Sequence, residues 1–222
     1  MTNPITKDIF QIGGDGFTVA EDAAVYLVYM DGRAAIVDAG CGKATDRLLE
    51  NIRHCKIPET AIEYLLITHC HYDHTGGAAD LKERLGLKIV AHHLDANYLE
   101  KGDQEVTAAS WYGARLKPVS VDIKLTRQTQ TIRLGQADIT AIHLPGHSPG
   151  SVVYQVTSEG QKVLFAQDVH GPIHPDLLSD PVAYQSSLKQ MLALDTDILC
   201  EGHYGVYYGR DAVKDFIGSF MT

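Results

Sequence analysis

Three histidines and an aspartate lie within six consecutive positions of this chain: His69, His71, Asp73 and His74. They directly follow an apolar run at 64–67 that is typical of a buried strand. Imidazoles crowded at a strand end repel one another when protonated and lose hydration when buried, so this arrangement costs stability unless something binds there. Because neutral imidazoles and carboxylate oxygens are ligands of divalent metals, the pattern predicts a metal site.

The spacing within this cluster suggests how it would be used. Residues two apart on an extended chain project to the same side, so His69 and His71 can hold one ion together. Asp73 and His74 lie just beyond, where the chain turns, and can face a second ion. Cys70 points away by the same alternation, and we interpret it as a small buried hydrophobic residue.

Three further candidates stand at strand ends or in glycine-rich turns downstream: His147 in LPGHSPG, Asp168 after FAQ, and His203 in LCEGH. The neighbouring glycines let the loops turn tightly and let the backbone approach closely. Taken singly, a histidine in a turn or an aspartate after a strand is an ordinary loop or capping residue. Together with the first cluster, they predict a metal centre to which both halves of the chain contribute.

This ordered set resembles the metal-binding motifs of the metallo-β-lactamase superfamily, and the resemblance covers nearly the entire chain. It implies an α/β fold, a four-layer αβ/βα sandwich in which two mixed sheets pack face to face with helices outside. The metal site then lies at one edge, between the sheets. The implied ligands are His69, His71 and His147 for a first metal, Asp73, His74 and His203 for a second, and Asp168 as a bridge. Asp38, at the end of a strand in a VDAG motif, would orient them.

The elements that position these residues follow from periodicity and turn signals. Strands are expected at 8–13, 24–30, 34–38, 63–68, 87–91, 121–126, 137–144, 151–156 and 162–166. Helices are expected at 44–54, 78–86, 94–100, 181–194 and 210–220. Two runs of strands, each followed by helices, predict two packed sheets in a single domain over residues 1–222. A doubly wound parallel sheet is the alternative, weakened by the hairpin-like pairs 24–30/34–38 and 151–156/162–166, which require antiparallel pairing.

Some segments near the predicted site allow two interpretations. For 102–118, which carries Trp111 and Tyr112, we favour a surface helix with aromatic core anchors over a loop that lines a substrate pocket. His170 and His174 follow Asp168 closely, and we favour hydrogen-bonded loop roles over a role on substrate. Structural roles are expected for four other histidines: His54, His92, His93 and His143.

Composition narrows the possible partners. With 19 basic and 28 acidic residues, the formal charge is −9. Such a surface repels phosphate backbones and anionic lipids, so we expect a small-molecule substrate and neither nucleic acid nor membrane as partner. The N-terminus lacks a signal-peptide core, and the four cysteines form no CxxC pair, so a cytoplasmic protein with reduced thiols is expected. Oligomeric state cannot be read from the sequence.

The predicted reaction is metal-dependent hydrolysis of a carbonyl compound. Two metals that share a carboxylate would provide a hydroxide nucleophile, which Asp73 would orient as the catalytic residue. We expect two Zn²⁺ per chain, with iron or manganese as alternatives, and a thioester or ester of a small molecule as substrate. The THxHxDHxGG motif resembles the glyoxalase II branch, which hydrolyses glutathione thioesters. Those enzymes hold glutathione with a C-terminal helical region, whereas this chain ends 19 residues after His203, which argues against glutathione itself.

Several related activities remain as alternatives. Acyl-homoserine lactonases place a tyrosine where this chain has Gly171, and class B1 β-lactamases place a cysteine where it has Asp168. Outside hydrolysis, a persulfide dioxygenase would use one iron held by two of the histidines and Asp168. A metal-binding module without catalysis would be expected to lack one of the metal ligands or Asp73. All seven proposed ligands, Asp73 among them, are present in this chain.

Overall fold

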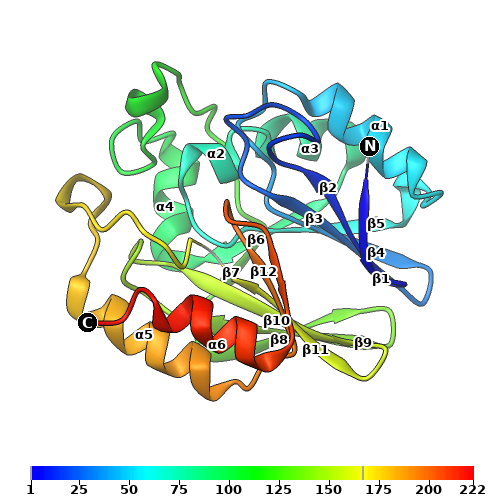
Figure 1. Cartoon of the computed structure of the whole chain (residues 1–222). Helices are drawn as coiled ribbons and strands as arrows, with labels where there is room; N and C mark the ends of the chain where they lie inside the picture. The colour runs from blue at the N-terminus through cyan, green and yellow to red at the C-terminus, as the bar shows by residue number, and fades with distance from the viewer. Residues whose placement is uncertain (1, 167) are drawn as a thin grey trace.

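Two β-sheets lie face to face in the computed structural model, which describes residues 2–166 and 168–222. Met1 and Gln167, the latter part of the FAQD motif, lie outside these ranges. The first sheet has seven strands in the order β1 to β7, and the second has six in the order β13-β12-β11-β10-β9-β8. Figure 1 shows the sheets in the middle of the molecule, with α1 and α3 above them and α5 and α6 below them.

The first sheet changes from antiparallel to parallel pairing at β4. Its strands are β1 (Asn3–Thr6), β2 (Ile9–Gly13), β3 (Val25–Met30), β4 (Arg33–Val37), β5 (Ile62–Leu66), β6 (Lys88–His92) and β7 (Ile123–Leu125). Helices α1 (Thr45–His54), α3 (Ala78–Leu85) and α4 (His93–Lys101) lie in the crossovers that parallel strands require. Because β4 and β5 are parallel neighbours, Asp38 and the histidine cluster leave the sheet at the same edge.

The second sheet places the downstream motifs at that site. Its strands are β8 (Thr129–Leu134), β9 (Ala137–His143), β10 (Val152–Ser158), β11 (Gln161–Ala166), β12 (Ile198–Glu201) and β13 (Val206–Tyr208). Strands β11 and β12 are parallel, with Ala166 opposite Glu201, so Asp168 and His203 both follow this pair by two residues. Helix α5 (Pro181–Ala193) connects them, and α6 (Arg210–Gly218) follows β13.

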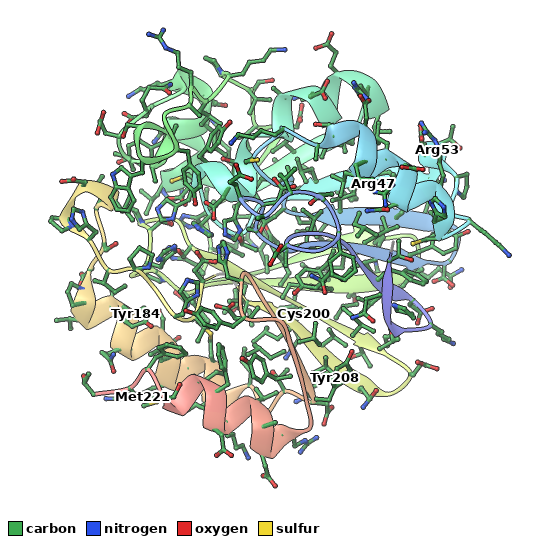
Figure 2. The ribbon with its side chains drawn as sticks, turned by 45° about the horizontal axis from the view of Figure 1, so that its top comes forward. Arg47, Arg53, Tyr184, Cys200, Tyr208 and Met221 are labelled. Carbon is green, nitrogen blue, oxygen red and sulfur yellow. The ribbon has the colours of Figure 1, made fainter. Side chains whose placement is uncertain are left out.

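The apolar residues form three layers that hold the sandwich together. Alternation along β5 sends Leu65 to the layer under the outer helices and Leu66 to the layer between the sheets. Cys200 of β12 joins the layer between the sheets, while Tyr184 of α5 belongs to the third layer, beneath α5 and α6. Figure 2 labels both residues, together with Arg47 on the exposed side of α1. The predicted four-layer αβ/βα sandwich is confirmed.

The pairing decides between the two predicted architectures. Both hairpins expected from the sequence are antiparallel, 24–30 with 34–38 and 151–156 with 162–166. The alternative of a doubly wound parallel sheet is therefore wrong. The short strands β1, β8 and β13 were not predicted, since β1 contains a proline and β8 alternates with polar residues between turns.

The segment 102–118 differs from expectation. Only a 3₁₀ turn, η2 (Ala109–Tyr112), forms there, and the Trp111 side chain is 49% exposed, so the favoured interpretation as a surface helix with core anchors is wrong. Left-handed backbone at Gly102, Ala108 and Gly113 interrupts any longer helix. The four cysteines are free, as expected, and Cys70 is buried in the apolar layer. Within residues 2–166 and 168–222, no helix is both long and apolar enough to cross a lipid bilayer.

Candidate metal centre

Asp38 anchors the loop that carries the first cluster. It lies just after β4 with a φ of 61°, a left-handed conformation that aspartate tolerates better than most residues. Its Oδ1 accepts the Thr68 N–H at 2.8 Å, and its Oδ2 accepts the Thr68 hydroxyl and His74 Nδ1–H, each at 2.7 Å. The carboxylate thus fixes the orientation of the His74 ring, in keeping with the orienting role expected for Asp38.

The Nε2 atoms of His69 and His147 lie 3.2 Å apart, with the two rings nearly perpendicular. Because the Thr68 hydroxyl donates to Asp38, the 3.0 Å contact between Thr68 Oγ1 and His69 Nδ1 assigns the ring proton to Nδ1. His147 Nδ1–H donates to the Pro172 carbonyl at 2.9 Å. Both Nε2 atoms therefore carry lone pairs, and two acceptors this close repel unless they share a cation.

His71 completes a group of three buried imidazoles. It directly precedes the short helix α2 (Tyr72–Thr75), and its carbonyl accepts the Thr75 hydroxyl at 2.8 Å, which fixes the backbone. Its Nε2 is buried and has no hydrogen-bond partner among the described residues. The candidate ligand atoms of His69, His71 and His147 all lie within 4.8 Å of one another.

A second group, with equally close ligand atoms, consists of Asp73, His74, Asp168 and His203. His203 Nε2 lies 3.1 Å from Asp73 Oδ2 and 3.4 Å from Asp168 Oδ2, and His74 Nε2 lies 3.0 Å from Asp168 Oδ1. Asp168 Oδ2 is also 3.5 Å from His147 Nε2, so this carboxylate contacts both groups. The structure brings together all seven residues that the sequence singled out.

Glu201 is a residue of the site that sequence reasoning missed. It is fully buried at the end of β12, and its carboxylate accepts four hydrogen bonds, at 2.7–3.0 Å: three from the backbone N–H groups of Val169, His203 and Tyr204, and one from His170 Nδ1–H. These bonds join the loops that carry Asp168 and His203. The only signal in the sequence was a charged residue closing an apolar strand, which does not reveal its partners.

Gly202 explains why a glycine stands beside His203. A Cβ there would lie 2.2 Å from Asp168 Oδ1 and 3.1 Å from the His74 ring, so any side chain would displace the carboxylate. Close approach, rather than backbone conformation, thus requires glycine at this position.

The electrostatics of the two groups differ. Burial, reinforced by neighbouring imidazoles, holds the pKa values of His69 and His71 well below the ordinary value, and burial also lowers the pKa of His147. These three rings are therefore neutral at physiological pH, the state in which imidazole binds metals.

In the second group, the carboxylates have the larger effect on the pKa values of the histidines. Burial lowers the pKa of His74, but Asp168, Asp38 and Asp73 outweigh it and hold that pKa well above its ordinary value. The same balance raises the pKa of His203 to about 10, chiefly through Asp168 against the effect of burial. For Asp168, burial raises the pKa, yet His74 and His203 bring it well below the usual range. The ionised carboxylates that favour the protonated rings would attract a divalent cation in the same way, and such a cation would replace the protons on the ring nitrogens.

The unpartnered atoms show that these residues fit metal ions. Among the described side chains, the few buried polar atoms that lack a hydrogen-bond partner include His71 Nε2, His74 Nε2 and Asp168 Oδ1. Buried polar groups without hydrogen bonds are costly, and these three come from two segments of the chain, with His74 Nε2 and Asp168 Oδ1 in ionic contact at 3.0 Å. These histidine and aspartate clusters are typical of a dinuclear metal centre.

A cavity of about 160 Å³ opens beside both groups. Its walls combine candidate ligands with apolar side chains of two loops, namely Ala108, Trp111 and Tyr112 from one loop and Pro172 and Leu177 from the other. The two loops are in contact, since the Trp111 and His174 rings meet edge to face with centroids 5.2 Å apart. A more polar groove of about 500 Å³, between residues 11–24 and 202–205, shares His203 with this cavity.

The remaining histidines have the partners of loop or structural residues. His170 is bonded to Glu201, as the favoured loop role implies, but it also lines the cavity. His174 Nδ1 accepts the Asp176 N–H. The expected structural roles agree with three contacts: His54 with the Glu50 carbonyl, His93 with the Leu125 carbonyl, and His92 stacked on His143.

Comparisons with known proteins agree with this geometry. The family model of the metallo-β-lactamase superfamily matches residues 19–203. The hydroxyacylglutathione hydrolase GloC of Haemophilus influenzae is 30% identical, with 78% of this chain and 81% of that protein aligned. The acyl-coenzyme A thioesterase MBLAC2 of Gallus gallus is 28% identical over 75% of this chain, and the alignment spans 64% of that protein's length. The class B3 di-zinc metallo-β-lactamase LRA-12 from an Alaskan soil metagenome is 26% identical, with a TM-score of 0.76 over 91% of this chain and 78% of that chain.

Proposed function

Since this chain belongs to the metallo-β-lactamase superfamily and is a metal-dependent hydrolase of that superfamily, we propose that it cleaves a thioester or ester of a small molecule with two zinc ions as cofactor. The observation that carries the proposal is the pair of facing Nε2 atoms of His69 and His147, 3.2 Å apart and next to Asp168. Acceptors in this arrangement require a shared cation.

The proposed ligands divide as the two groups do. His69, His71 and His147 would hold one ion, Asp73, His74 and His203 would hold the other, and Asp168 would contact both. Zinc accepts nitrogen and carboxylate oxygen ligands, and a catalytic site needs only three protein ligands and an open position. The neutral state of the three buried imidazoles supports the first ligand set.

When bound, such a pair of ions lowers the pKa of a water molecule and polarises the substrate carbonyl. In the proposed reaction, the Asp73 carboxylate accepts a hydrogen bond from the attacking water and orients it. The water oxygen forms a bond to the acyl carbon, the carbon–sulfur or carbon–oxygen bond breaks, and the leaving group takes up a proton. The apolar side chains of Trp111, Pro172 and Leu177 in the cavity wall would limit the access of bulk water to the reacting carbonyl.

Two observations favour a thioester or ester with a small acyl group. The activities for which the two relatives are named, hydroxyacylglutathione hydrolysis and acyl-coenzyme A thioester hydrolysis, are both thioester cleavages. The cavity of about 160 Å³ has apolar walls at Ala108, Leu177 and Trp111, which suits a short acyl chain. The larger polar groove beyond His203 then offers room for the leaving group.

The test combines metal analysis with a substrate panel. Protein purified without added metal is analysed for zinc, iron and manganese, and then assayed with thioesters, esters, lactones, β-lactams and phosphodiesters. We expect about two zinc ions per chain and the highest kcat/KM on a thioester or ester. One iron per chain, with oxygen consumption on glutathione persulfide, would overturn the hydrolase proposal. Cleavage of only β-lactams or phosphodiesters would overturn the substrate class, and cleavage of only lactones, which are cyclic esters, would overturn the open-chain substrate expected here.

A further inference from the structure

Asp95 is a fully buried carboxylate in the first turn of α4 that none of the site motifs includes. An aspartate in this position would ordinarily interact with the N–H groups of its own helix. Its hydrogen bonds in the described structure go elsewhere: Oδ2 accepts the Cys70 N–H at 2.9 Å and the Ser148 hydroxyl at 2.6 Å, and Oδ1 accepts the Gly150 N–H at 2.6 Å.

These three donors belong to the two loops that carry the group of three histidines. Cys70 lies between His69 and His71, whereas Ser148 and Gly150 follow His147 within the PGHSPG turn. One carboxylate therefore connects a loop of the first sheet with a loop of the second. The Ser148 hydroxyl also lies 2.9 Å from Ser151 Oγ, which extends the connection into the start of β10.

The fit around Asp95 is close. A Cβ on Gly150 would lie 2.6 Å from Asp95 Cγ, so this position has room only for glycine while the carboxylate stays in place. Burying a carboxylate costs free energy that its hydrogen bonds must offset, and burial indeed raises the pKa of Asp95. Such a group is most useful where it fixes other groups relative to one another.

We propose that Asp95 is a positioning residue that holds His69, His71 and His147 in mutual register and thereby sets the metal affinity of that group. The inference rests on the proposed dinuclear centre. We expect the main effect on this one group, because Asp95, among the described residues, contacts neither loop segment of the second group, where His74 is held by Asp38 and the loops of Asp168 and His203 are held by Glu201.

The test is the isosteric variant Asp95→Asn. Its amide NH₂ must face either the Cys70 N–H or the Gly150 N–H, so one loop loses its acceptor whichever way the amide is turned. We expect the zinc affinity of one site per chain to fall by about 10- to 100-fold, the range usual when a residue that supports the ligands from outside is changed. Titration against a competing chelator should then leave one tightly bound zinc ion per chain instead of two.

A spectroscopic readout separates positioning from general stability. With Co²⁺ in place of zinc, the visible absorption bands report ligand geometry, and we expect those of one site to shift in Asp95→Asn. Asp122→Asn is the matched control, since Asp122 also accepts a backbone N–H, from Ile89 at 2.8 Å, but touches neither histidine loop. It should lower stability while two tight zinc ions and the wild-type Co²⁺ spectrum remain.

Gly150→Ala provides a second, independent variant. It keeps Asp95 but crowds its carboxylate, and its backbone does not need a positive φ, so we expect the same loss at one site. If Asp95→Asn fails to fold, this variant decides. Wild-type affinity and Co²⁺ spectra in the variants would overturn the positioning role alone, with the proposed function intact. A wild-type protein that binds no metal would overturn both.

Discussion

Asp73 is a residue of the second group that also lines the cavity, as His71 does. Its Oδ2 lies 3.1 Å from His203 Nε2. Burial raises the pKa of Asp73, but His74 and His203 outweigh it and bring that pKa below the ordinary value, so the group is ionised. An ionised carboxylate at this position can accept a hydrogen bond from the attacking water. Its role differs in this respect from that of Asp38, which is surrounded by donors of the protein itself.

Asp73→Asn should abolish most of the turnover without unfolding the protein. The amide keeps the shape of the side chain but is a weaker acceptor for the attacking water, and we expect kcat to fall by about 10²- to 10⁴-fold. Steady-state assays measure the loss, and near-ultraviolet circular dichroism reports the fold. Asp138→Asn, on the outer part of β9, serves as a control that should keep wild-type kcat. Full activity in Asp73→Asn would contradict the proposed mechanism.

The sequence predicted the seven clustered residues because their types and order are themselves the signal. Glu201 and Asp95 could not be predicted in the same way, since each acts on loops that lie far away along the chain. Asp95 is 53 positions from its partner Ser148, and Glu201 is 32 positions from Val169. Before folding, such residues cannot be distinguished from an acidic residue at a helix start or a strand end.

At the level of elements, the site depends on pairs of parallel strands that end at one edge. Strands β4 and β5 deliver Asp38 and the first cluster, and β11 and β12 deliver Asp168 and His203. The apolar runs of these strands were strong enough to be predicted. The interval 102–118 was not, because its aromatic residues suggest core packing, whereas Trp111 and Tyr112 line the cavity instead.

Trp111→Ala should change which acyl groups are accepted. Removing the indole enlarges the cavity, so we expect kcat/KM to rise for longer acyl chains and to fall for short ones, each by about 10-fold, as when one or two methylene groups gain or lose contact. A thioester series from two to eight carbons measures the shift. Tyr208→Ala removes an exposed aromatic residue of β13 outside the cavity and should leave the series unchanged. An unaltered profile in Trp111→Ala would refute the role of this loop.

A separate cluster of histidines at the end of β6, outside the candidate metal centre, should affect the stability of the protein at acidic pH. The His92 ring stacks on the His143 ring with centroids 3.8 Å apart, and its Nδ1 is buried without a partner among the described residues. Burial and the neighbouring imidazoles lower the pKa of His92 to about 3. Between pH 6.5 and that value the unfolded chain binds a proton that the folded protein does not, so stability is lost as the pH falls.

His92→Phe should remove this part of the acid sensitivity. The variant keeps a planar ring against His143 but cannot be protonated at this position. As the pH falls, its free energy of unfolding should therefore decline less steeply than that of the wild type, the slopes differing by up to roughly 1.4 kcal/mol per pH unit. Urea unfolding at several pH values from 7 to 4, in metal-free wild type and variant, measures the difference. Parallel curves for the two proteins would show that His92 is not the group responsible.

Across the whole molecule, the proposed ligands come from both sheets. His69, His71, Asp73 and His74 follow β5 of the first sheet, and the other three belong to loops of the second. Bound ions would therefore link the two sheets at one edge, while the apolar layer at Leu66, Tyr154 and Phe165 holds them together elsewhere. The metal-free protein should keep its fold but lose a large part of its stability.

Chelation should lower the thermal midpoint of unfolding. A ligand present at about 1,000 times its dissociation constant stabilises the folded state by about 4 kcal/mol per site, and this contribution disappears when the metal is removed. Differential scanning calorimetry with and without chelator measures the change, and added Zn²⁺ should reverse it whereas Mg²⁺ should not. An identical midpoint for both forms would argue against a metal centre that joins the sheets.

The register between β11 and β12 also constrains how this protein can vary in evolution. Ala166 faces Glu201 across the pair, and Asp168 and His203 each stand two positions further along the chain, so the register sets how these two ligands meet. Deleting one residue from either strand would turn its side chains to the opposite face and move Asp168 or His203 away from the partner. Changes of length should therefore be tolerated only in segments such as 102–118 and 169–180. New specificities would arise through insertions there, while the strands that carry the ligands keep a constant length.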